Sequence, residues 1–301
     1  MNTTVAAWGK LLRISLSATA VGDVLAGCVL ATGGVSDVSA VLRLVAASLC
    51  IYHGGMALND WADRGEDADF GRQRPIPDGQ IGAGAALVVA TLLLIAGPLL
   101  AASVDPGAAT WALALTALVV LYDLVGRGDL LGPALLAGCR FLNLSLPFLA
   151  LGDGLATPLV VWSAPLVYGI YVFTLSRLGR YEDGQARPLP GETPARLLLT
   201  LAALLVVVPL LPAAPLSWIG RGVALALCGW AAVGLVQESR RLRRWTAEEV
   251  PRAMGFALRR MLIFAAAFSA LPGTPESLLV AAVVLGLYPV SWQLRKVFPP
   301  S

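Results

Sequence analysis

The chain has 301 residues, a mean hydropathy of +0.75, 57% hydrophobic residues and only 14% charged residues. This composition excludes an ordinary soluble globular domain, in which about a quarter of the residues are charged. The formal net charge of +3 comes with no basic patch interleaved with aromatic residues, so the sequence does not indicate a nucleic-acid-binding protein. The chain is therefore expected to be an integral membrane protein.

Ten apolar stretches follow one another along the chain, and each approaches the roughly 20 residues that a helix needs to cross a bilayer. They lie at 11–33, 38–60, 82–103, 108–125, 130–151, 157–178, 195–213, 217–236, 254–271 and 276–294. Because a helix satisfies its backbone hydrogen bonds within one segment, an all-α multi-pass membrane protein with nine to ten transmembrane helices is predicted. Arg259 and Arg260 in the ninth stretch suit either a snorkelling span or a surface helix.

The basic residues fall mostly on one side of this arrangement. If the N-terminus is cytoplasmic and every stretch crosses, all but three of the 22 Lys and Arg residues are cytoplasmic. The exceptions are Arg43 and Arg221 on the other side and Arg140 within a span. This asymmetry predicts a protein of the cell (inner) membrane with a cytoplasmic N-terminus. The basic run at 237–245 is expected to contact the head groups of membrane lipids.

The segment 59–77, NDWADRGEDADFGRQRPIP, concentrates charge in a chain that is otherwise mostly apolar. Asn59, Asp63 and Asp67 are spaced i, i+4 and i+8, so a helix that continues past the second stretch places them on one face over about 12 Å. Mg²⁺ accepts such oxygen ligands while it keeps waters and substrate phosphates in its shell. A cytoplasmic metal site that also includes Asp60 is predicted, and the alternative is a solvated acidic loop paired with its own arginines.

A second loop resembles the first in sequence. RPIPDG at 74–79 recurs as RPLPGE at 187–192, and each copy follows an apolar stretch and an acidic cluster. The recurrence indicates a weak internal repeat within a single integral-membrane domain, with halves of roughly 1–125 and 126–301. Because repeats in membrane bundles commonly place the functional site where the halves meet, the two loops are expected to face a shared cavity.

Polar side chains inside the predicted spans are expected to face the interior of the bundle, because ionisable groups are costly in lipid. These residues are Asp23, His53, Arg140 and Asn143. Asp23 and Arg140 have complementary charges and can form a pair. His53, the single histidine of the chain, is expected to hydrogen-bond in helix packing, and the alternative is a base on the acceptor side of a reaction.

The first loop also carries a resemblance to a known family. Its string N-D-x-x-D-x-x-x-D is formed by Asn59, Asp60, Asp63 and Asp67. R-x-R-P-x-P follows at 72–77, and together the two strings resemble the first acidic motif of the UbiA superfamily of intramembrane prenyltransferases. LYDLVGR at 121–127 stands where this family has a tyrosine-containing loop with a basic residue, and Asp23 stands where the family often has Asn or Asp.

The resemblance implies a helical bundle around a lipid-open central cavity, in which Mg²⁺ bridges the acidic loops to an isoprenoid diphosphate. The prenyl group would pass to a hydrophobic acceptor, either aromatic or lipid-like. Asn59, Asp63 and Asp67 would be catalytic through the metal. The residues expected to bind the diphosphate are Arg72, Arg74, Arg127, Arg177 and Arg180. The residues expected to line the cavity are Asp23, Tyr122, Arg140, Asn143, Tyr168 and Tyr181.

The second loop departs from the family pattern. Members usually carry D-x-x-x-D after the sixth span, whereas this chain has Gly179 and Asp183 at that spacing, with Glu182 beside them. Glu182 and Asp183 are the remaining candidates for metal ligands in this loop. The form of the loop is similar to that of the divergent EboC-like branch of the superfamily.

Three functions are therefore open at the level of sequence. The first is a Mg²⁺-dependent prenyltransferase, and the second is a terpene cyclase that uses the same ionisation of a diphosphate. The third is a non-catalytic carrier or transport component for a membrane lipid. The sequence contains no G-x-x-x-x-G-K-[ST] signature, so an ATP-driven pump is not indicated.

Overall fold

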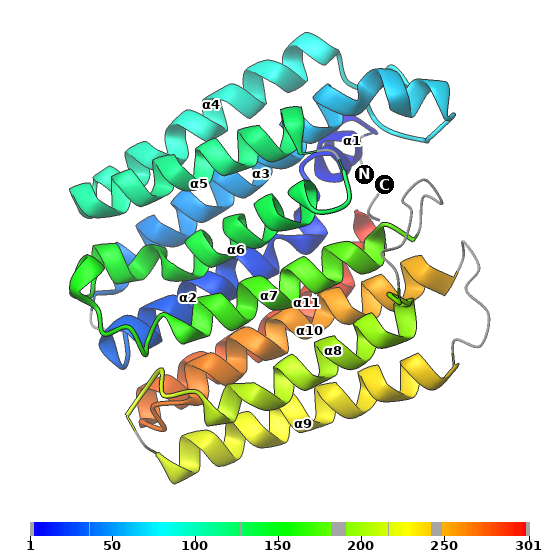
Figure 1. The fold of residues 1–301 in the computed structure, drawn as a ribbon. Helices are drawn as coiled ribbons and strands as arrows, with labels where there is room; N and C mark the ends of the chain where they lie inside the picture. Colours follow the sequence, from blue (N-terminus) through cyan, green and yellow to red (C-terminus); the bar gives the residue numbers. More distant parts are fainter. Residues whose placement is uncertain are drawn as a thin grey trace.

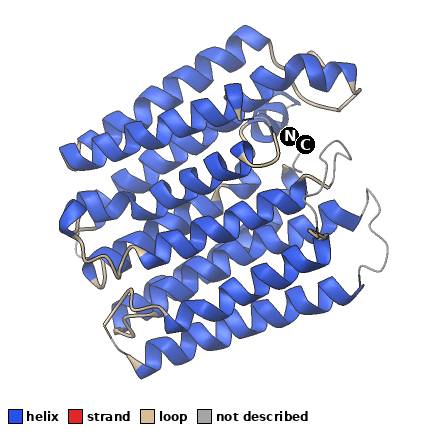
Figure 2. Ribbon diagram, viewed as in Figure 1, coloured by secondary structure: helices blue, strands red, loops and turns tan. Residues whose placement is uncertain are grey.

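The structure, a computed structural model, describes residues 3–35, 37–126, 128–181, 191–215, 217–241 and 249–298. Within these ranges the chain forms helices and loops and no strand (Figure 2). The α-helices are α1 (Thr3–Leu11), α2 (Ala18–Thr32), α3 (Val38–Asp69), α4 (Ala83–Ala102), α5 (Pro106–Val125), α6 (Leu131–Ala150), α7 (Ser163–Gly179), α8 (Pro194–Val207), α9 (Trp218–Arg241), α10 (Glu249–Ala270) and α11 (Pro275–Val297). Short 3₁₀ helices are η1 (Ile14–Leu16), η2 (Gly154–Ala156) and η3 (Val208–Leu210).

Several helices begin at a polar residue whose side chain caps free backbone N–H groups. Asp37 accepts a hydrogen bond from the backbone N–H of Ala40 at 3.0 Å, and Asp105 accepts one from that of Gly107 at 2.6 Å. Thr274 caps α11 in the same way. Each cap lies in a connection between two apolar stretches and satisfies an N–H group at the start of a helix. The remaining backbone groups hydrogen-bond within the helix, as a helix in lipid requires.

Eight helical segments of the described chain are long and apolar enough to cross a membrane. They are 14–32 and α3, α4, α5, α6, α9, α10 and α11. The sixth and seventh predicted spans form shorter helices, α7 with 17 residues and α8 with its extension η3, which pack along the same bundle (Figure 1). The all-α membrane fold is confirmed.

α10 runs unbroken through Arg259 and Arg260 and is largely buried, so the surface-helix alternative is wrong.

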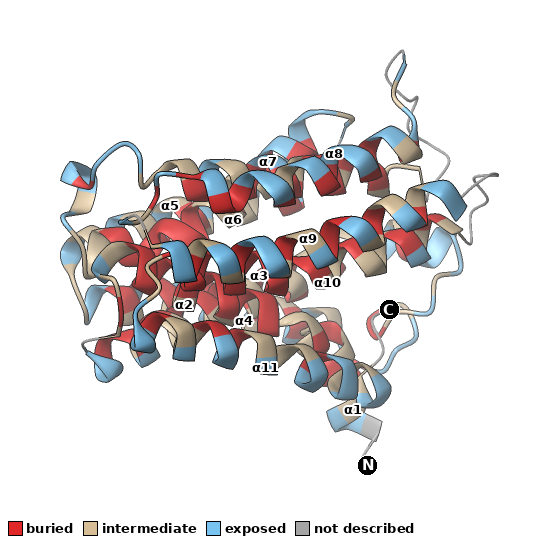
Figure 3. Ribbon diagram, turned by 90° about the horizontal axis from the view of Figure 1, so that it is seen from below, coloured by how far each residue is buried: buried red, intermediate tan, exposed pale blue. Residues whose placement is uncertain are grey.

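The core consists of two adjoining hydrophobic clusters. One joins α3, α4 and α5, the other joins α7, α8, α9 and α10, and α2 and α6 contribute to both. Buried residues face inward and exposed residues lie on the outer surfaces of the bundle (Figure 3). Large apolar side chains such as Leu92, Leu99 and Trp230 are among the exposed ones, as expected where a helix faces lipid. The internal repeat stays a prediction.

Glycines allow α3 and α4 to pack closely. A Cβ added at Gly97 would lie 2.4 Å from the side chain of Ile51 and 3.0 Å from the carbonyl oxygen of Ala47. A Cβ at Gly54 would likewise lie 2.8 Å from the side chain of Leu94. Small residues at such contacts let two backbones approach within the membrane. This contact holds the long helix α3, whose last turns carry the acidic segment.

Candidate functional site

The acidic segment forms the last turns of α3, which continues as a helix through all of it. An α-helix turns about 100° per residue, so Asn59, Asp63 and Glu66 share one side of α3. Asp60 and Asp67 lie about 90° around the axis from that side. The stripe of ligands expected from the sequence is therefore divided between two faces of the helix.

The first face lines a cavity of about 560 Å³, a size typical of small-molecule sites. Its walls come from α3, α5, α6, α7 and α10 and from the connection between α5 and α6. The polar and charged lining residues are Asn59, Asp63, Glu66, Arg72, Tyr122, Asp123, Asp129, Arg140, Ser176 and Arg180. Apolar side chains, including Leu136, Val172, Leu175 and Leu258, complete the lining. Acidic and basic groups thus face one shared cavity.

Asn59, Asp63 and Asp123 form a group of oxygen donors in this cavity. The Asn59 amide donates a hydrogen bond to Asp63 Oδ2 at 3.3 Å and lies within hydrogen-bonding reach of Asp123. Asp123 is only 5% exposed, and its Oδ2 has no hydrogen-bond partner among the described residues. A buried carboxylate oxygen without a partner is suited to accept a cation or a proton. Sequence reasoning missed Asp123, although it directly follows Tyr122 in the tyrosine-containing stretch.

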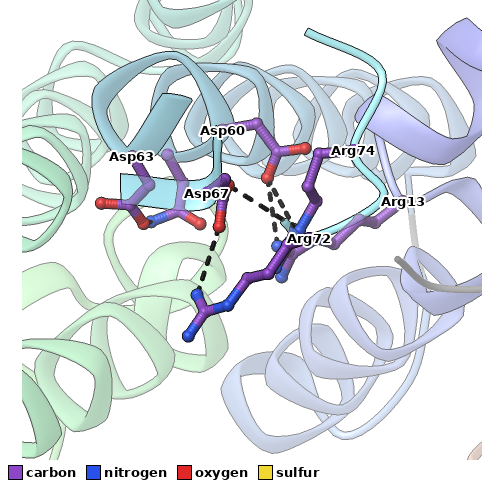
Figure 4. A network of polar contacts seen from close by, with 7 residues as sticks. Arg13, Asp60, Asp63, Asp67, Arg72 and Arg74 are labelled. Carbon is purple, nitrogen blue, oxygen red and sulfur yellow. Dashed lines mark hydrogen bonds and ion pairs between the residues drawn. The ribbon is translucent and has the colours of Figure 1, made fainter. Parts of the chain in front are cut away.

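The second face of α3 binds arginines (Figure 4). Asp60 Oδ1 accepts hydrogen bonds from Arg13 Nη2 at 3.2 Å and from Arg74 Nη1 at 3.0 Å. Asp67 Oδ1 accepts one from Arg72 Nη1 at 3.2 Å, and Arg74 Nε lies 3.8 Å from Asp67 Oδ2. Both carboxylates are buried, and neither lines the cavity. For the whole segment 59–77, the sequence left open that the acidic side chains pair with the loop's own arginines. Asp60 and Asp67 do pair with arginines in this way.

The loop after α3 turns back over this second face. Gly71 and Gly79 have positive φ angles of 63° and 70°, a conformation that glycine adopts without strain. The turn brings Arg72 and Arg74 over the two buried carboxylates. Arg72 also lines the cavity, whereas Arg74 does not, so Arg72 is the arginine of this loop that can reach a ligand there.

Among its described residues, the second loop contributes one arginine, Arg180, to the cavity. Arg180 lines it, together with Val172 and Ser176 on the same side of α7. Arg177 was also expected to bind a diphosphate, but it is 2% exposed and lies outside the lining. Its Nε donates to Glu192 Oε1 at 3.1 Å and its Nη2 pairs with Glu192 Oε2, because it lies on a different face of α7 that points toward the start of α8.

Three of the predicted site residues, Arg127, Glu182 and Asp183, lie outside the described residues. Tyr181, expected in the cavity lining, instead donates a hydrogen bond from its hydroxyl to the backbone oxygen of Glu192 at 3.0 Å. Burial raises the pKa of Tyr181, and the carboxylate of Glu192 raises it further. Tyr181 therefore links the end of α7 to the residues just before α8.

A buried polar network lies behind the cavity wall. Asp23 Oδ2 accepts from Arg140 Nη1 at 2.8 Å and from Asn143 Nδ2 at 3.1 Å, and Asp23 Oδ1 accepts from the Tyr168 hydroxyl at 2.6 Å. The predicted pair of Asp23 and Arg140 is confirmed. Because Asp23 and Tyr168 are fully buried around this pair, they do not line the cavity as expected, whereas Arg140 does.

A smaller, mainly apolar pocket of about 90 Å³ adjoins the main cavity. The two share the walls formed by Tyr122, Asp123, Leu136 and Arg140. Asn143 lines this smaller pocket rather than the main cavity. The apolar residues that surround it include Ile51, Met56, Leu115 and Val119. The polar cavity thus continues into a region that suits a hydrocarbon chain.

His53 lies on α3 outside both cavities. Its Nδ1 is 2.7 Å from the backbone oxygen of Leu12, which precedes η1. The contact ties the N-terminal segment to α3. This geometry agrees with the hydrogen-bonded packing role expected for His53.

Comparison with known proteins identifies the family. The model of the UbiA prenyltransferase family matches residues 20–263, which is most of the chain. The chain belongs to the UbiA prenyltransferase family. Over a shorter region, a digeranylgeranylglyceryl phosphate synthase of Methanothrix thermoacetophila is 40% identical across 76 residues. That match spans 25% of this chain and 28% of that synthase.

Solved structures of UbiA proteins share the fold. A structure described for a digeranylgeranylglyceryl phosphate synthase in membranes has a TM-score of 0.64 and 16% identity, covering 92% of this chain and 99% of its own. A UbiA homologue from Archaeoglobus fulgidus, solved with DMAPP and Mg²⁺, has a TM-score of 0.64 and 14% identity over 93% of this chain and 99% of its own. The apo UbiA homologue from Aeropyrum pernix K1 scores 0.61 at 15% identity, over 83% and 96% of the two chains.

The described part of this UbiA protein contains no group of three or more His, Cys, Asp or Glu side chains placed to hold a metal ion by themselves. Asn59, Asp63 and Asp123 supply two carboxylates and an amide instead. Such a set fits a cation that takes one or two carboxylates and fills its remaining positions with water and phosphate oxygens, as Mg²⁺ does. It does not resemble the closed His and Cys sites of zinc.

Proposed function

We propose that this protein is a Mg²⁺-dependent prenyltransferase that ionises an isoprenoid diphosphate in the central cavity and passes the prenyl group to a hydrophobic acceptor. One observation carries the proposal. A single cavity brings the oxygen donors Asn59, Asp63 and Asp123 to the guanidinium groups of Arg72 and Arg180, and it continues into an apolar pocket. The UbiA homologues solved with DMAPP or GPP and Mg²⁺ support the choice of substrate class.

The polar half of the cavity would hold the diphosphate. Asn59, Asp63 and Asp123 would hold the cation, and bound Mg²⁺ would neutralise negative charge that grows on the leaving diphosphate. Arg72 and Arg180 would donate charge-assisted hydrogen bonds to its oxygens. Because these groups are already placed in a partly buried site, they stabilise the developing charge without large rearrangement.

The apolar half would hold the prenyl chain and the cation that forms. The bond from C1 to the diphosphate oxygen breaks with its electron pair on the diphosphate, and the acceptor's nucleophile bonds to C1 and loses its proton to water or to the diphosphate. Tyr122 borders both cavities, so its ring can stabilise positive charge on the allylic carbons. The apolar walls keep water from the carbocation.

The remaining predicted ligands take a different place in this proposal. Asp60 and Asp67 would reach a cation only by giving up their arginine partners, so we infer that they position the loop around the site. Glu182 and Asp183 stay predicted ligands from the second loop. In this proposal the cavity faces the cytoplasmic side of the cell membrane, which the basic asymmetry of the sequence supports.

The test is an assay with purified protein, Mg²⁺ and a series of labelled prenyl diphosphates. Pyrophosphate release is measured with and without quinone, phenol and sugar-phosphate acceptors, and the products are identified. A prenylated acceptor is the expected product. Released hydrocarbon without any acceptor would identify a terpene cyclase. No release with any substrate, from protein that unfolds cooperatively, would contradict the proposal and favour a lipid carrier.

Asp123 provides a sharper prediction about the metal site. The Asp123→Asn variant is expected to bind Mn²⁺, used in place of Mg²⁺, about 10- to 100-fold more weakly, because one of two carboxylates is lost. Paramagnetic resonance of free Mn²⁺ measures this affinity without turnover. The control is Asp69→Asn, which removes an exposed carboxylate at the end of α3. Equal Mn²⁺ affinity in both variants would show that Asp123 is no ligand.

A further inference from the structure

A groove runs along the outer surface of the bundle between α8 and α9. It has a volume of about 490 Å³ and shares no lining residue with the central cavity. The two helices lie side by side and run in opposite directions at one edge of the bundle (Figure 1). Most of the lining is apolar and includes Ala202 and Val206 of α8 and Gly229 and Ala232 of α9. The groove is therefore a second hollow, separate from the proposed site of prenyl transfer.

Small residues leave room in this groove. Ala202 and Ala232 are buried between the two helices, whereas Val206 and Val233 line the groove and are exposed. A Cβ added at Gly229 would meet no atom within 4 Å, so the groove is open at this position. Exposed apolar side chains on membrane helices face lipid tails, because the hydrocarbon region offers no other solvent. The groove therefore suits a hydrocarbon chain.

One end of the groove is polar and positively charged. Gln237 and Arg240 line it about one turn apart on α9, and both are exposed. No acidic residue of the described chain lines the groove. The neighbouring Glu238 is buried on another side of α9, with its Oε1 3.9 Å from Arg252 Nε, so it does not neutralise Arg240. A guanidinium and an amide placed in this way can donate hydrogen bonds to the oxygens of one phosphate.

The length of the groove matches one leaflet of a bilayer. From Gly229 to Arg240 the axis of α9 rises about 16 Å. Half of a hydrocarbon core of roughly 30 Å is about 15 Å. Arg240 lies in the last turn of α9, at the same end of the bundle as the loop after α3 (Figure 1). The sequence continues with Arg241, Arg243 and Arg244, and such basic clusters next to a membrane helix attract anionic lipids. A lipid with its phosphate at Arg240 would thus reach the middle of the bilayer at Gly229.

A second copy of the chain fits the groove less well than a lipid does. Two copies that face the same way in a membrane are related by rotation about the membrane normal, so in a two-fold dimer the same face meets itself. Contact through this groove would bring Arg240 and Arg241 of both copies together at one level of the membrane, where their charges repel. An anionic lipid instead supplies both a negative group and a hydrocarbon chain.

We propose that the groove between α8 and α9 is a binding site for one anionic phospholipid. The phosphate of the lipid accepts hydrogen bonds from Arg240 and Gln237, and one of its acyl chains lies along the two helices over Ala232 and Gly229. The bound lipid thereby holds α8 and α9 together on the outside of the bundle. The site does not depend on the proposed function, because the groove and the central cavity have no lining residue in common.

Photo-crosslinking of the full chain in phosphatidylcholine nanodiscs tests the proposal. The nanodiscs contain a trace of phosphatidylglycerol, or of phosphatidylcholine, that carries a diazirine near the end of one acyl chain. After illumination, mass spectrometry of peptides measures the label on α8 and α9. Phosphatidylglycerol is expected to label these helices about fivefold more than phosphatidylcholine does, the effect of one basic residue on an anionic lipid.

Two variants test the two ends of the groove. Arg240→Gln is expected to lower the labelling by phosphatidylglycerol to that by phosphatidylcholine. Its control is Arg241→Gln, which removes the same charge from the next exposed residue, outside the lining, and is expected to keep the preference. Gly229→Leu places a side chain in the groove and is expected to remove the excess label as well. Its control is Gly222→Leu, at another position of α9 where an added Cβ meets no atom within 4 Å.

Three results would overturn the proposal. Equal labelling of the wild type by the two lipids would reduce the groove to ordinary contact with bulk lipid. Equal losses in Arg240→Gln and Arg241→Gln would reduce the preference to general surface charge. Two chains in each nanodisc, counted by native mass spectrometry and separated by Gly229→Leu, would assign the groove to a second copy. Thermal unfolding confirms that each variant is folded, and the crosslinking needs no turnover, so its outcome is independent of prenyl transfer.

Discussion

Asp63→Asn is expected to lower Mg²⁺-dependent pyrophosphate release by about 100- to 1000-fold, comparable to losing one group that stabilises a transition-state charge. Asp63 faces the central cavity from α3, in hydrogen-bond contact with Asn59. The amide keeps the shape of the side chain but removes the negative charge that attracts a divalent cation. The rate of release from a labelled prenyl diphosphate, measured at saturating Mg²⁺ and at limiting Mg²⁺, gives the size of the effect.

Two controls make this result specific. Asp69→Asn removes an exposed carboxylate near the end of the same helix and is expected to change the rate less than twofold. Raising the Mg²⁺ concentration is expected to recover part of the activity of Asp63→Asn, because weaker metal binding contributes to its loss. Similar rates in wild type and Asp63→Asn would place the cation elsewhere and remove the basis of the proposed function.

Asp23→Ala is expected to destabilise the fold by about 3–5 kcal/mol, the usual effect of removing one partner of a buried ion pair. Asp23 is fully buried and accepts hydrogen bonds from Arg140, Asn143 and Tyr168. Without it, the guanidinium of Arg140 keeps its charge among apolar helices, and two further donors lose their acceptor. Cooperative unfolding in detergent, followed by circular dichroism with increasing denaturant, measures the change.

The double variant Asp23→Leu with Arg140→Met distinguishes charge from packing. Apolar replacement of a whole buried pair is often neutral, so the double variant is expected to recover most of the stability lost in Asp23→Ala. Asp153→Ala, which removes an exposed carboxylate in the α6 to α7 connection, serves as a control for the general effect of losing an acid. A loss below 1 kcal/mol in Asp23→Ala would mean that the network contributes little to stability.

Part of the site followed directly from local sequence. The interpretation of Asn59, Asp63 and Asp67 as one stripe required the second span to continue as a helix, and α3 does continue through them. The spacing did not predict that Asp67 joins Asp60 on the arginine-bound face. That division depends on the path of the loop after α3 and on Arg13, which is 47 residues away from Asp60 along the chain.

Asp123 shows why another part could not be predicted. In the sequence it follows Tyr122 near the end of an apolar stretch, and no spacing links it to Asn59 and Asp63. It becomes a candidate ligand only because α5 packs beside α3 and brings it to Asn59 and Asp63. Arg177 shows the reverse case, since a motif arginine next to a predicted phosphate site turned out to be bound to Glu192.

Hydropathy and helical periodicity are local properties, so the sequence by itself determined that this chain is a multi-pass helical membrane protein with charge gathered after its second span. The tertiary structure alone decided which carboxylates face the cavity, which are held by arginines, and which side chains surround Asp23. The physical reason is that these contacts join residues far apart in the chain, such as Asp23 and Arg140 at a separation of 117 residues. Only the packing of whole helices sets such distances.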